Sequence, residues 1–335
     1  YTINNLSGIS ISNGTGTASN YTLTGGTHSF TIAERIISVN GTRLYDATSN
    51  AEASDLSTQT NLVGSQTLVL SGTGIIASRD VESNKTVSVG TLTLADGSNG
   101  GLAANYTLSG GTHQLTVTQR PLNSSGSKTY DSNTDALANA ITLSNLAGGE
   151  TLVHSGTATT SSANANSYTI NNLAGIGISN GTGTASNYTL TGGTHSFTIN
   201  KRVVSLSGGS RQYNGSATAI AADLPTINNL VGSETLTLSG NGVVENANVG
   251  DNKPLTNLSG LTLQNGSNGG LAANYTLSGG SSIISITPRI LTLDGSRVYD
   301  GTTNSNSSDL TISNLVGSET LSLSGFGTVT SGNIG

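Results

Sequence analysis

Histidine is the side chain of this sequence that would most directly carry acid–base or metal chemistry. Three of the four histidines, His28, His113 and His195, stand at the same place after Gly-Gly-Thr, and Ser282 takes that place in a fourth copy. A metal-binding or catalytic histidine needs partners, and no Cys, His or carboxylate follows nearby at ligand spacing. The pattern therefore favours a histidine on the surface of a strand over a metal ligand or a catalytic base.

Carboxylates are the second class of side chain that could act chemically. They are few and scattered, and no pair of acids recurs, so hydrolysis of sugars by paired acids has no visible basis. Asp-rich calcium loops are absent, and no Gly-rich loop follows a strand and opens a helix as a phosphate-binding motif does. We expect no enzyme, no catalytic residue, no cofactor and no bound metal.

A more regular pattern places a basic residue two positions before a tyrosine. It occurs at Arg43 and Tyr45, Lys128 and Tyr130, Arg211 and Tyr213, and Arg297 and Tyr299. Residues two apart share one face of a strand, so cation and ring should be neighbours. Two interpretations are open: a solvated cation lying along the ring edge, or a weak glycan contact in which a sugar stacks on the ring. Repeated along the chain, such weak sites would gain avidity on a polysaccharide.

These residues must be positioned by strands rather than helices. Apolar residues alternate with small or polar ones, as in Leu68 and Leu70, or Leu236 and Leu238, between turns rich in Gly, Asn and Ser. This period of two is typical of half-buried strands, and no stretch sustains the 3.6-residue period of an amphipathic helix. Helix should be scarce, and the fold class all-β.

The strongest organising feature is a repeat of about 84 residues. Asn-Tyr-Thr-Leu recurs with its tyrosine at Tyr21, Tyr106, Tyr188 and Tyr275, and a Leu-Val-Gly-Ser-Glu-type segment starts at Leu62, Leu146, Leu230 and Leu315. An arginine closes each copy, at Arg35, Arg120, Arg202 and Arg289. We therefore expect complete repeats at 36–120, 121–202 and 203–289, with a head segment (1–35) and a tail segment (290–335) that are the second and first parts of further repeats.

Two sequence relationships refine this division. Residues 1–32 and 168–199 are nearly the same string, differing only where Ser7 and Ser10 become Ala174 and Gly177. Head and tail together make about one more whole repeat. The chain begins within a repeat and without Met, so we expect it to be a piece of a longer protein.

The strands of one repeat can be placed from its turns. In the first complete repeat we expect strands at 36–39, 43–45, 67–71, 74–77, 87–94, 106–108 and 114–118, with a polar loop at 50–55. Short strands with frequent turns fit a small β-sandwich or open barrel. Repeats this small have little core of their own and should be stabilised by contacts with their neighbours. This predicts a tandem array of β-sandwich-like domains forming an extended rod.

The core of each repeat should be thin and should include the tyrosine of Asn-Tyr-Thr-Leu: Tyr21, Tyr106, Tyr188 and Tyr275.

The repeat 121–202 should be the least stable of the complete repeats. His154 occupies the place of Leu70 and Leu238 there, and Ala147 replaces a valine. His154 is read either as a tolerated substitution or as a weak point that gains charge in mildly acidic solution.

Composition narrows the choice of partners. The chain has no Cys, Met or Trp, and its net charge of −6 is spread without a basic run. That argues against nucleic acid or an anionic membrane as partner, while the lack of disulfides fits a bacterial extracellular or a cytosolic protein equally. Asn-x-Thr sequons at Asn20, Asn105, Asn187 and Asn274 leave glycosylation open.

The order of the motifs resembles that of a known family, the YDG-type repeat and the related MBG type of filamentous-haemagglutinin-like bacterial adhesins. The segments that carry the resemblance are Tyr299–Thr303, Gly317–Gly325, Val249–Lys253, Asn274–Leu277 and Ile286–Arg289. The sequence departs from the pattern at Asn214, Gln66, Ala47 and Ser132. These departures argue against a catalytic or metal role for the motif positions and leave a structural role intact.

The resemblance implies a long secreted protein, often exported by two-partner secretion through an outer-membrane transporter, that extends from the cell surface. We expect a structural stalk segment of an extracellular surface adhesin in cell adhesion or biofilm formation, whose partners are the neighbouring repeats. The alternative is an array of weak carbohydrate-binding modules contacting matrix polysaccharide or host glycan.

Overall fold

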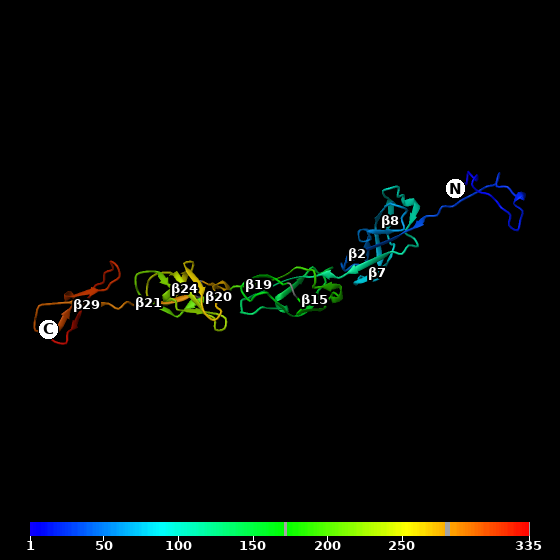
Figure 1. The fold of residues 1–335 in the computed structure, drawn as a ribbon. Helices are drawn as coiled ribbons and strands as arrows, with labels where there is room; N and C mark the ends of the chain where they lie inside the picture. The colour runs from blue at the N-terminus through cyan, green and yellow to red at the C-terminus, as the bar shows by residue number, and fades with distance from the viewer. Residues whose placement is uncertain (171–172, 279–281, 335) are drawn as a thin grey trace. The chain divides into compact units, whose positions relative to one another are not determined.

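The computed structural model describes residues 1–170, 173–278 and 282–334, and strands dominate them (Figure 1). The helices in these ranges are all 3₁₀ turns of three residues. In the described part of the chain, no helix has the length and apolar character needed to cross a membrane. The prediction of an all-β fold built from small tandem repeats is confirmed.

The first complete repeat and the residues leading into it carry ten strands. They are β1 (Arg35–Ile36), β2 (Ser38–Leu44), β3 (Asn50–Glu52), β4 (Thr58–Thr60), β5 (Leu68–Ser71), β6 (Thr73–Ile76), β7 (Glu82–Ser88), β8 (Thr93–Asp96), β9 (Tyr106–Thr107) and β10 (Gln114–Thr118). The short helices are η1 (Ala18–Asn20) in the head segment, then η2 (Ala53–Asp55) and η3 (Ala103–Asn105).

The second complete repeat follows a similar order of elements, with the single strand β15 in the place of β5 and β6. Its strands are β11 (Arg120–Pro121), β12 (Asn123–Thr129), β13 (Asp135–Leu137), β14 (Ile141–Ser144), β15 (Leu152–Thr159), β16 (Asn166–Thr169), β17 (Ile176–Asn180), β18 (Tyr188–Thr189) and β19 (His195–Asn200). Its helices are η4 (Ala138–Ala140) and η5 (Ala185–Asn187).

The third complete repeat and the tail segment complete the described chain. The repeat contains β20 (Arg202–Ser207), β21 (Gly209–Gln212), β22 (Thr218–Ile220), η6 (Ala221–Asp223), β23 (Thr226–Asn228), β24 (Leu236–Val244), β25 (Gly250–Asn257), β26 (Leu261–Asn265), η7 (Ala272–Asn274), β27 (Tyr275–Leu277) and β28 (Ile283–Thr287). The tail segment contains β29 (Thr292–Gly295), β30 (Asn304–Asn306), η8 (Ser307–Asp309), β31 (Leu310–Ser313) and β32 (Phe326–Thr328).

A parallel pair of strands closes the first and the third repeat. In the first repeat the last strand, β10, pairs parallel with β2 and antiparallel with β7 within a six-stranded sheet of order β3-β6-β7-β10-β2-β4. In the third repeat β28 pairs in the same way with β21 and β25. The closing strand β10 alternates half-buried and buried residues, with Leu115 and Val117 pointing inward. Period-two patterning therefore decides which face of the closing strand enters the core.

The arginine at each repeat boundary begins the next repeat rather than only ending the last. Arg35 pairs parallel with Tyr106, Arg120 with Tyr188, and Arg202 with Tyr275. The Arg120 guanidinium also donates from Nε and Nη2 to the backbone and side-chain oxygens of Asn145, at 2.7 and 2.8 Å. The arginine thus fixes the entry of the chain into the following repeat.

The chain divides into two compact units, each with its own core. One comprises Tyr1–Ser124, Leu143–His154 and Gly177–Thr194, and the other comprises Ser125–Thr142, Ser155–Ile176 and His195–Gly335. The core of the first unit is built from the first repeat, including Ile37, Val39 and Leu115, and it continues into Ala147 and Tyr188 of the second repeat. The apolar packing therefore does not stop at the repeat boundary.

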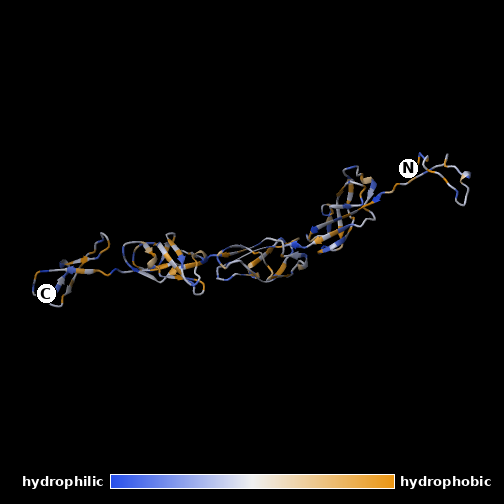
Figure 2. Cartoon of the chain, in the orientation of Figure 1, coloured by the Kyte–Doolittle hydropathy of each residue, from blue (hydrophilic) through white to orange (hydrophobic). Residues whose placement is uncertain are grey.

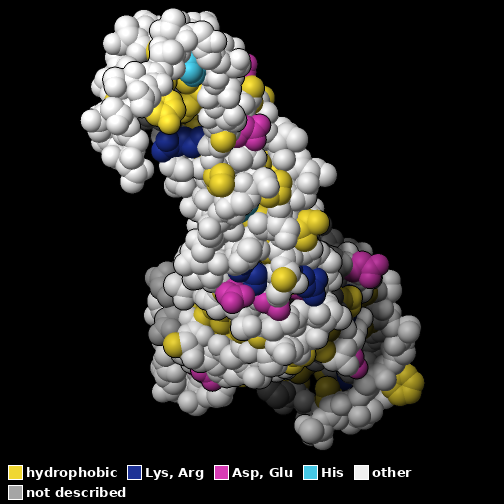
Figure 3. Space-filling view, turned by 90° about the vertical axis from the view of Figure 1, so that its right-hand side faces the viewer, with side chains coloured by type: hydrophobic (Ala, Val, Ile, Leu, Met, Phe, Trp, Pro, Cys, Tyr) yellow, Lys and Arg dark blue, Asp and Glu magenta, His cyan; other side chains and the backbone are white. Residues whose placement is uncertain are grey.

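Hydropathy and charge follow the strand pattern. Figure 2 shows hydrophobic residues concentrated in the strands of the complete repeats, with hydrophilic residues in the turns. On the face drawn in Figure 3, most of the surface is uncharged. Basic and acidic side chains lie beside one another near the middle of this face, and other charged side chains stand apart. The charged residues on this face therefore form no continuous field of one sign.

Several expected elements differ from the structure. The segment 50–55, expected to be a loop, forms β3 and η2, because β3 pairs with β6. The expected strand 87–94 is interrupted, with β7 ending at Ser88 and β8 beginning at Thr93. Burial of the repeated tyrosine is confirmed for Tyr106, Tyr188 and Tyr275, whereas Tyr21 in the head segment is 71% exposed.

Candidate functional site

The aspartate of the basic-x-Tyr-Asp motif builds a tight turn. The Asp46 carboxylate accepts the backbone N–H of Thr48 at 2.9 Å, and Asp300 accepts that of Thr302 at 2.9 Å. Asn214 keeps the same bond, accepting from the Ser216 N–H at 3.1 Å. Because an amide oxygen serves as well as a carboxylate oxygen in such a turn, the substitution at Asn214 preserves the structure.

The basic residue of the motif holds this turn from the inside. Arg43 is 8% exposed, forms an ion pair with Asp46, and donates from Nη2 to the Thr48 carbonyl at 2.8 Å. Lys128 makes the matching contacts, with the Asp131 carboxylate at 2.8 Å and the Asn133 carbonyl at 2.9 Å. The first interpretation of the pattern was a solvated cation lying along the ring edge. It is wrong for these two residues, because each cation binds the turn instead.

The tyrosine of the motif faces the core, and this corrects the glycan-contact hypothesis for two copies. Tyr45 is completely buried and Tyr130 is 3% exposed, so neither ring face is available to a sugar. In the other copies, Tyr213 is half-buried and Tyr299 is 59% exposed. The basic partners Arg211 and Arg297 bond to the turns that follow their tyrosines, as Arg43 does. In all four copies of the motif, the basic residue therefore stabilises the turn that follows the tyrosine.

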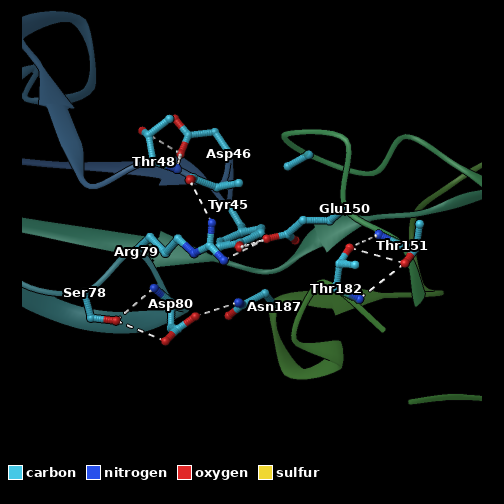
Figure 4. A network of polar contacts seen from close by, with 12 residues as sticks. Tyr45, Asp46, Thr48, Ser78, Arg79, Asp80, Glu150, Thr151, Thr182 and Asn187 are labelled. Carbon is cyan, nitrogen blue, oxygen red and sulfur yellow. Dashed lines mark hydrogen bonds and ion pairs between the residues drawn. The ribbon is translucent and has the colours of Figure 1, made fainter. Parts of the chain in front are cut away.

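The buried tyrosine reaches across the repeat boundary to a glutamate (Figure 4). The Tyr45 hydroxyl donates to Oε1 of Glu150 at 2.9 Å, and the Tyr188 hydroxyl donates to Oε2 at 2.6 Å. The two rings meet edge to face, 5.4 Å between centroids. The Tyr188 hydroxyl also accepts the backbone N–H of Ala147 at 3.1 Å. We call this arrangement of two tyrosines on one glutamate the tyrosine clasp.

The next junction has the same clasp. Tyr130 and Tyr275 donate to the two carboxylate oxygens of Glu234 at 2.7 and 2.6 Å, and their rings are again 5.4 Å apart edge to face. The Tyr275 hydroxyl accepts the N–H of Val231 at 3.1 Å. In both junctions the first tyrosine comes from one repeat, and the glutamate and second tyrosine come from the following repeat. Three separate motifs thus converge at each boundary.

The clasps set the electrostatics of the junctions. Burial, followed by the hydrogen bond to the glutamate, raises the pKa of Tyr130, Tyr188 and Tyr275 to about 12 in each case. The same causes raise the pKa of Tyr45. At the first junction Arg79 adds an ion pair, 3.1 Å from Glu150. Phenols next to a carboxylate resist ionisation because a second negative charge would be placed beside the first.

The asparagine before the second tyrosine makes a second link across the boundary. Asn187 is 1% exposed; its Oδ1 accepts the Val81 N–H at 2.9 Å, and its Nδ2 donates to Asp80 at 2.8 Å. Asn274 is completely buried and bonds in the same way to Ala165 and Asn164. Because both amides are consumed by these contacts, Asn187 and Asn274 are not available for glycosylation in the folded chain.

Two further copies of the glutamate position each accept from a single tyrosine in the described residues. Tyr106 donates to Gln66, which stands in place of the glutamate. At the far end, Tyr213 donates to Glu319 of the tail segment. A glutamine offers one acceptor oxygen, which suffices for one phenol, whereas the two complete junctions place two phenols on the two oxygens of a carboxylate.

The repeated histidine differs from its expected surface position most clearly at His113, whereas His28 and His195 are half-buried. His113 is 2% exposed; its Nδ1 accepts the Val39 N–H at 3.2 Å, and its Nε2 lies 2.8 Å from the Leu108 carbonyl. Ser282 takes over this role in the third repeat, accepting the Leu206 N–H at 3.1 Å and donating to the Ser278 carbonyl at 2.9 Å. A side chain that can be replaced by serine serves to satisfy buried backbone groups. Over the described residues, no group of three or more His, Cys, Asp or Glu side chains could hold a metal ion.

Sequence reasoning missed the glutamates as functional residues. The available signal was that Glu150, Glu234 and Glu319 recur at the repeat period together with two tyrosines, in a chain with only 18 acidic residues. The period revealed which residues recur. It did not reveal that residues of neighbouring repeats meet.

The fold and the clasps define a tandem-repeat all-β protein whose repeated motifs join one repeat to the next. The family model of the YDG domain matches the chain twice, at residues 32–114 and 200–282, so the chain contains a YDG repeat region. Comparison with curated proteins gives no match.

Proposed function

We propose that this chain is a structural repeat segment in the stalk of a large secreted bacterial surface adhesin that acts in cell adhesion or biofilm formation. Its task is to hold other parts of the parent protein away from the cell. The parent protein would be extracellular, at the outer surface of the bacterium, and exported through an outer-membrane transporter. We assign the segment no catalytic activity.

The proposal rests on one observation: the repeated motifs connect neighbouring repeats. Three repeated residues form contacts between repeats. They are the tyrosine of basic-x-Tyr-Asp, the glutamate and the tyrosine of Asn-Tyr-Thr-Leu, as in Tyr45, Glu150 and Tyr188. Links that combine a shared apolar core with buried hydrogen bonds suit a segment that must keep its neighbours in a fixed order. The family match and the motif order support the adhesin context.

Burial of Tyr45 and Tyr130 weighs against the alternative in which each repeat stacks a sugar on this tyrosine. A spacer experiment in an adhesin that carries this segment separates the two functions. The repeats are replaced by unrelated rigid domains of equal total length, and adhesion of the cells is compared with that after simple deletion. A stalk predicts that deletion impairs adhesion and that the foreign spacer restores it. Adhesion that returns only with the original repeats would overturn the proposal.

Solution shape gives a second measurement on the isolated chain. A single compact domain of this length would have a radius of gyration of about 20 Å. An extended array of linked repeats should give a clearly larger value in small-angle X-ray scattering. A value near that of the compact domain would count against the stalk.

A further inference from the structure

We propose that the first and the third complete repeat bear tension along the chain, because the strands by which the chain enters and leaves each of them are paired in a geometry that resists pulling. The inference goes beyond the proposed function, since a stalk can keep its parts at a distance without carrying a load. It rests on the direction of strand pairing and on the hydrogen bonds that reinforce it.

The strands that enter and leave the first repeat lie side by side. The chain enters through β1 and β2 and leaves through β10. β1 pairs parallel with β9 over two residues. β2 pairs parallel with β10 over five residues, from Asn40 opposite Gln114 to Leu44 opposite Thr118. We call these two parallel pairs the clamp of the first repeat.

The direction of the strands decides how the clamp responds to force. Tension reaches the repeat at the start of its entering strand and leaves it at the end of β10. Because β2 and β10 run in the same direction, these two points lie at opposite ends of the pair. A pull on both slides one strand along the other, so the hydrogen bonds of the ladder stretch together. Strands pulled from the same end separate one bond at a time.

Further hydrogen bonds join the same two segments at both ends of the clamp. At the exit, the Tyr45 N–H donates to the Thr118 carbonyl at 2.9 Å, and Oγ1 of Thr118 donates to the Arg43 carbonyl at 3.1 Å. At the entry, Oγ of Ser38 accepts the N–H of Thr112 at 2.9 Å. These bonds add to the number that must break before the strands can slide.

The buried histidine belongs to this set of bonds. His113 directly precedes β10, and its Nδ1 accepts the N–H of Val39 on β2 at 3.2 Å. Val39 and Leu115 are 0% exposed and Val117 is 1% exposed, so apolar side chains shield the ladder from water. A hydrogen bond in such a low-dielectric environment is stronger than one in water. The clamp therefore combines loading of all its bonds at once with exclusion of water.

The third repeat has the same arrangement. β20 pairs parallel with β27 over three residues, and β21 pairs parallel with β28 over four. The Tyr213 N–H donates to the Thr287 carbonyl at 2.9 Å, and Oγ1 of Thr287 donates to the Arg211 carbonyl at 3.3 Å. Ser282 takes the place of the histidine, and its Oγ accepts the N–H of Leu206 at 3.1 Å. Both ends of the pair are thus reinforced at the same points as in the first repeat.

Very little chain separates one repeat from the next. Only Gln119 lies between the end of β10 and the start of β11, and only Lys201 lies between β19 and β20. A flexible linker would extend first when the chain is pulled. Here tension passes from the last strand of one repeat to the first strand of the next.

Single-molecule force spectroscopy on the full chain tests the proposal. The chain has no cysteine, so a pair of introduced cysteines gives unique attachment points. Glu34→Cys with Gln119→Cys pulls the first repeat at its entry and exit, which loads the clamp in shear. Glu34→Cys with Ala104→Cys pulls at the same end of β1 and β9, which peels them apart. All three side chains are exposed.

The rupture force should be about twofold or more higher in the shear arrangement than in the peeling arrangement at one loading rate, since forced unfolding follows the unfolding rate. The length of chain released at rupture shows that the repeat was folded when it was pulled. Equal forces in the two arrangements, or a lower force in shear, would overturn the proposal.

Two matched substitutions on β10 locate the resistance. Thr116 and Thr118 are both half-buried. Thr118→Val removes the bond to the Arg43 carbonyl within the clamp, whereas Thr116→Val removes the bond that Oγ1 accepts from the Asn84 N–H of β7. Thr118→Val should lower the rupture force in shear more than Thr116→Val does. A larger fall with Thr116→Val would overturn the proposal, because the contact with β7 would then set the force.

Discussion

The hydroxyl of Tyr45 donates a hydrogen bond to Oε1 of Glu150 over 2.9 Å, and the two residues are 105 positions apart in neighbouring repeats. With Tyr188 on Oε2, the carboxylate is bound on both oxygens inside a buried junction. Since hydrogen bonds to a charged group are stronger than neutral ones, this link is expected to couple the folding of one repeat to that of the next.

The substitution Glu150→Gln should weaken that coupling. An amide keeps one acceptor oxygen, so one of the two buried phenols loses its acceptor, and the Arg79 ion pair is lost as well. We expect a destabilisation of about 1–3 kcal/mol, measured by hydrogen exchange of the segments around residue 150 and by urea unfolding. The exposed Glu245→Gln is the matched control and should change little. Equal effects of both variants would contradict a role for the clasp.

Strongly alkaline pH should weaken the junctions. The pKa of Tyr130, Tyr188 and Tyr275 is raised to about 12 from an ordinary value of 10.0. A raised folded pKa means that this contribution to stability is complete below about pH 10 and is lost as the pH rises towards about 12. Thermal unfolding across that range, followed with the near-ultraviolet absorbance of phenolate, should show the loss. Tyr188→Phe should remove part of it, and an unchanged pH profile in that variant would exclude Tyr188 as a source.

The buried asparagines allow a comparison inside one motif. Asn187→Ala should destabilise the first junction by about 1–3 kcal/mol, because the Val81 N–H and the Asp80 carboxylate lose their partner. Asn105→Ala alters the same motif at an exposed position and should have a smaller effect. Chemical denaturation of the two variants side by side provides the measurement. A larger loss in Asn105→Ala would be incompatible with the junction contact.

Backbone strain predicts a substitution that stabilises the protein. Ala47 and Ser132 have φ angles of 67° and 64°, at the position where Gly215 and Gly301 have 75° and 76°. The left-handed region disfavours a side chain but suits glycine. Ala47→Gly should therefore stabilise the first repeat by about 0.5–1 kcal/mol after the greater freedom of glycine in the unfolded chain is allowed for. Calorimetry on this variant and on Ser132→Gly tests it, and destabilisation by both would refute the strain argument.

The predicted softness of the second repeat remains open to test. His154 is half-buried, as are Leu70 and Leu238 at the matching positions. His154→Leu should stabilise this repeat by about 1 kcal/mol through better apolar packing. Hydrogen exchange resolves the repeats separately, and protection should rise in 121–202 more than in 203–289. The neighbouring exposed Val153→Thr serves as control. A decrease in protection would show that the histidine packs better than leucine.

The sequence by itself determined the local and periodic properties of this protein. Alternation in segments such as Leu68 to Leu70 marked strands and their inner faces, and glycine and asparagine marked turns, because both effects depend on residues close together in the chain. The repeat period identified the tyrosines that matter, and the departures at Asn214 and Ala47 correctly pointed to a structural role. Burial of Tyr188 and Tyr275 followed from the same pattern.

Only the tertiary structure decided which of these residues meet. The parallel pairing of Arg120 with Tyr188 carries the chain across the boundary and brings Glu150 under Tyr45. Other non-local pairings bury His113 against Val39 and turn the segment at Asn50–Glu52 into a strand. A period in the sequence repeats every residue equally and does not distinguish contacts within a repeat from contacts between repeats. That distinction depends on which strand edges pair, and edge pairing is settled by packing over the whole chain.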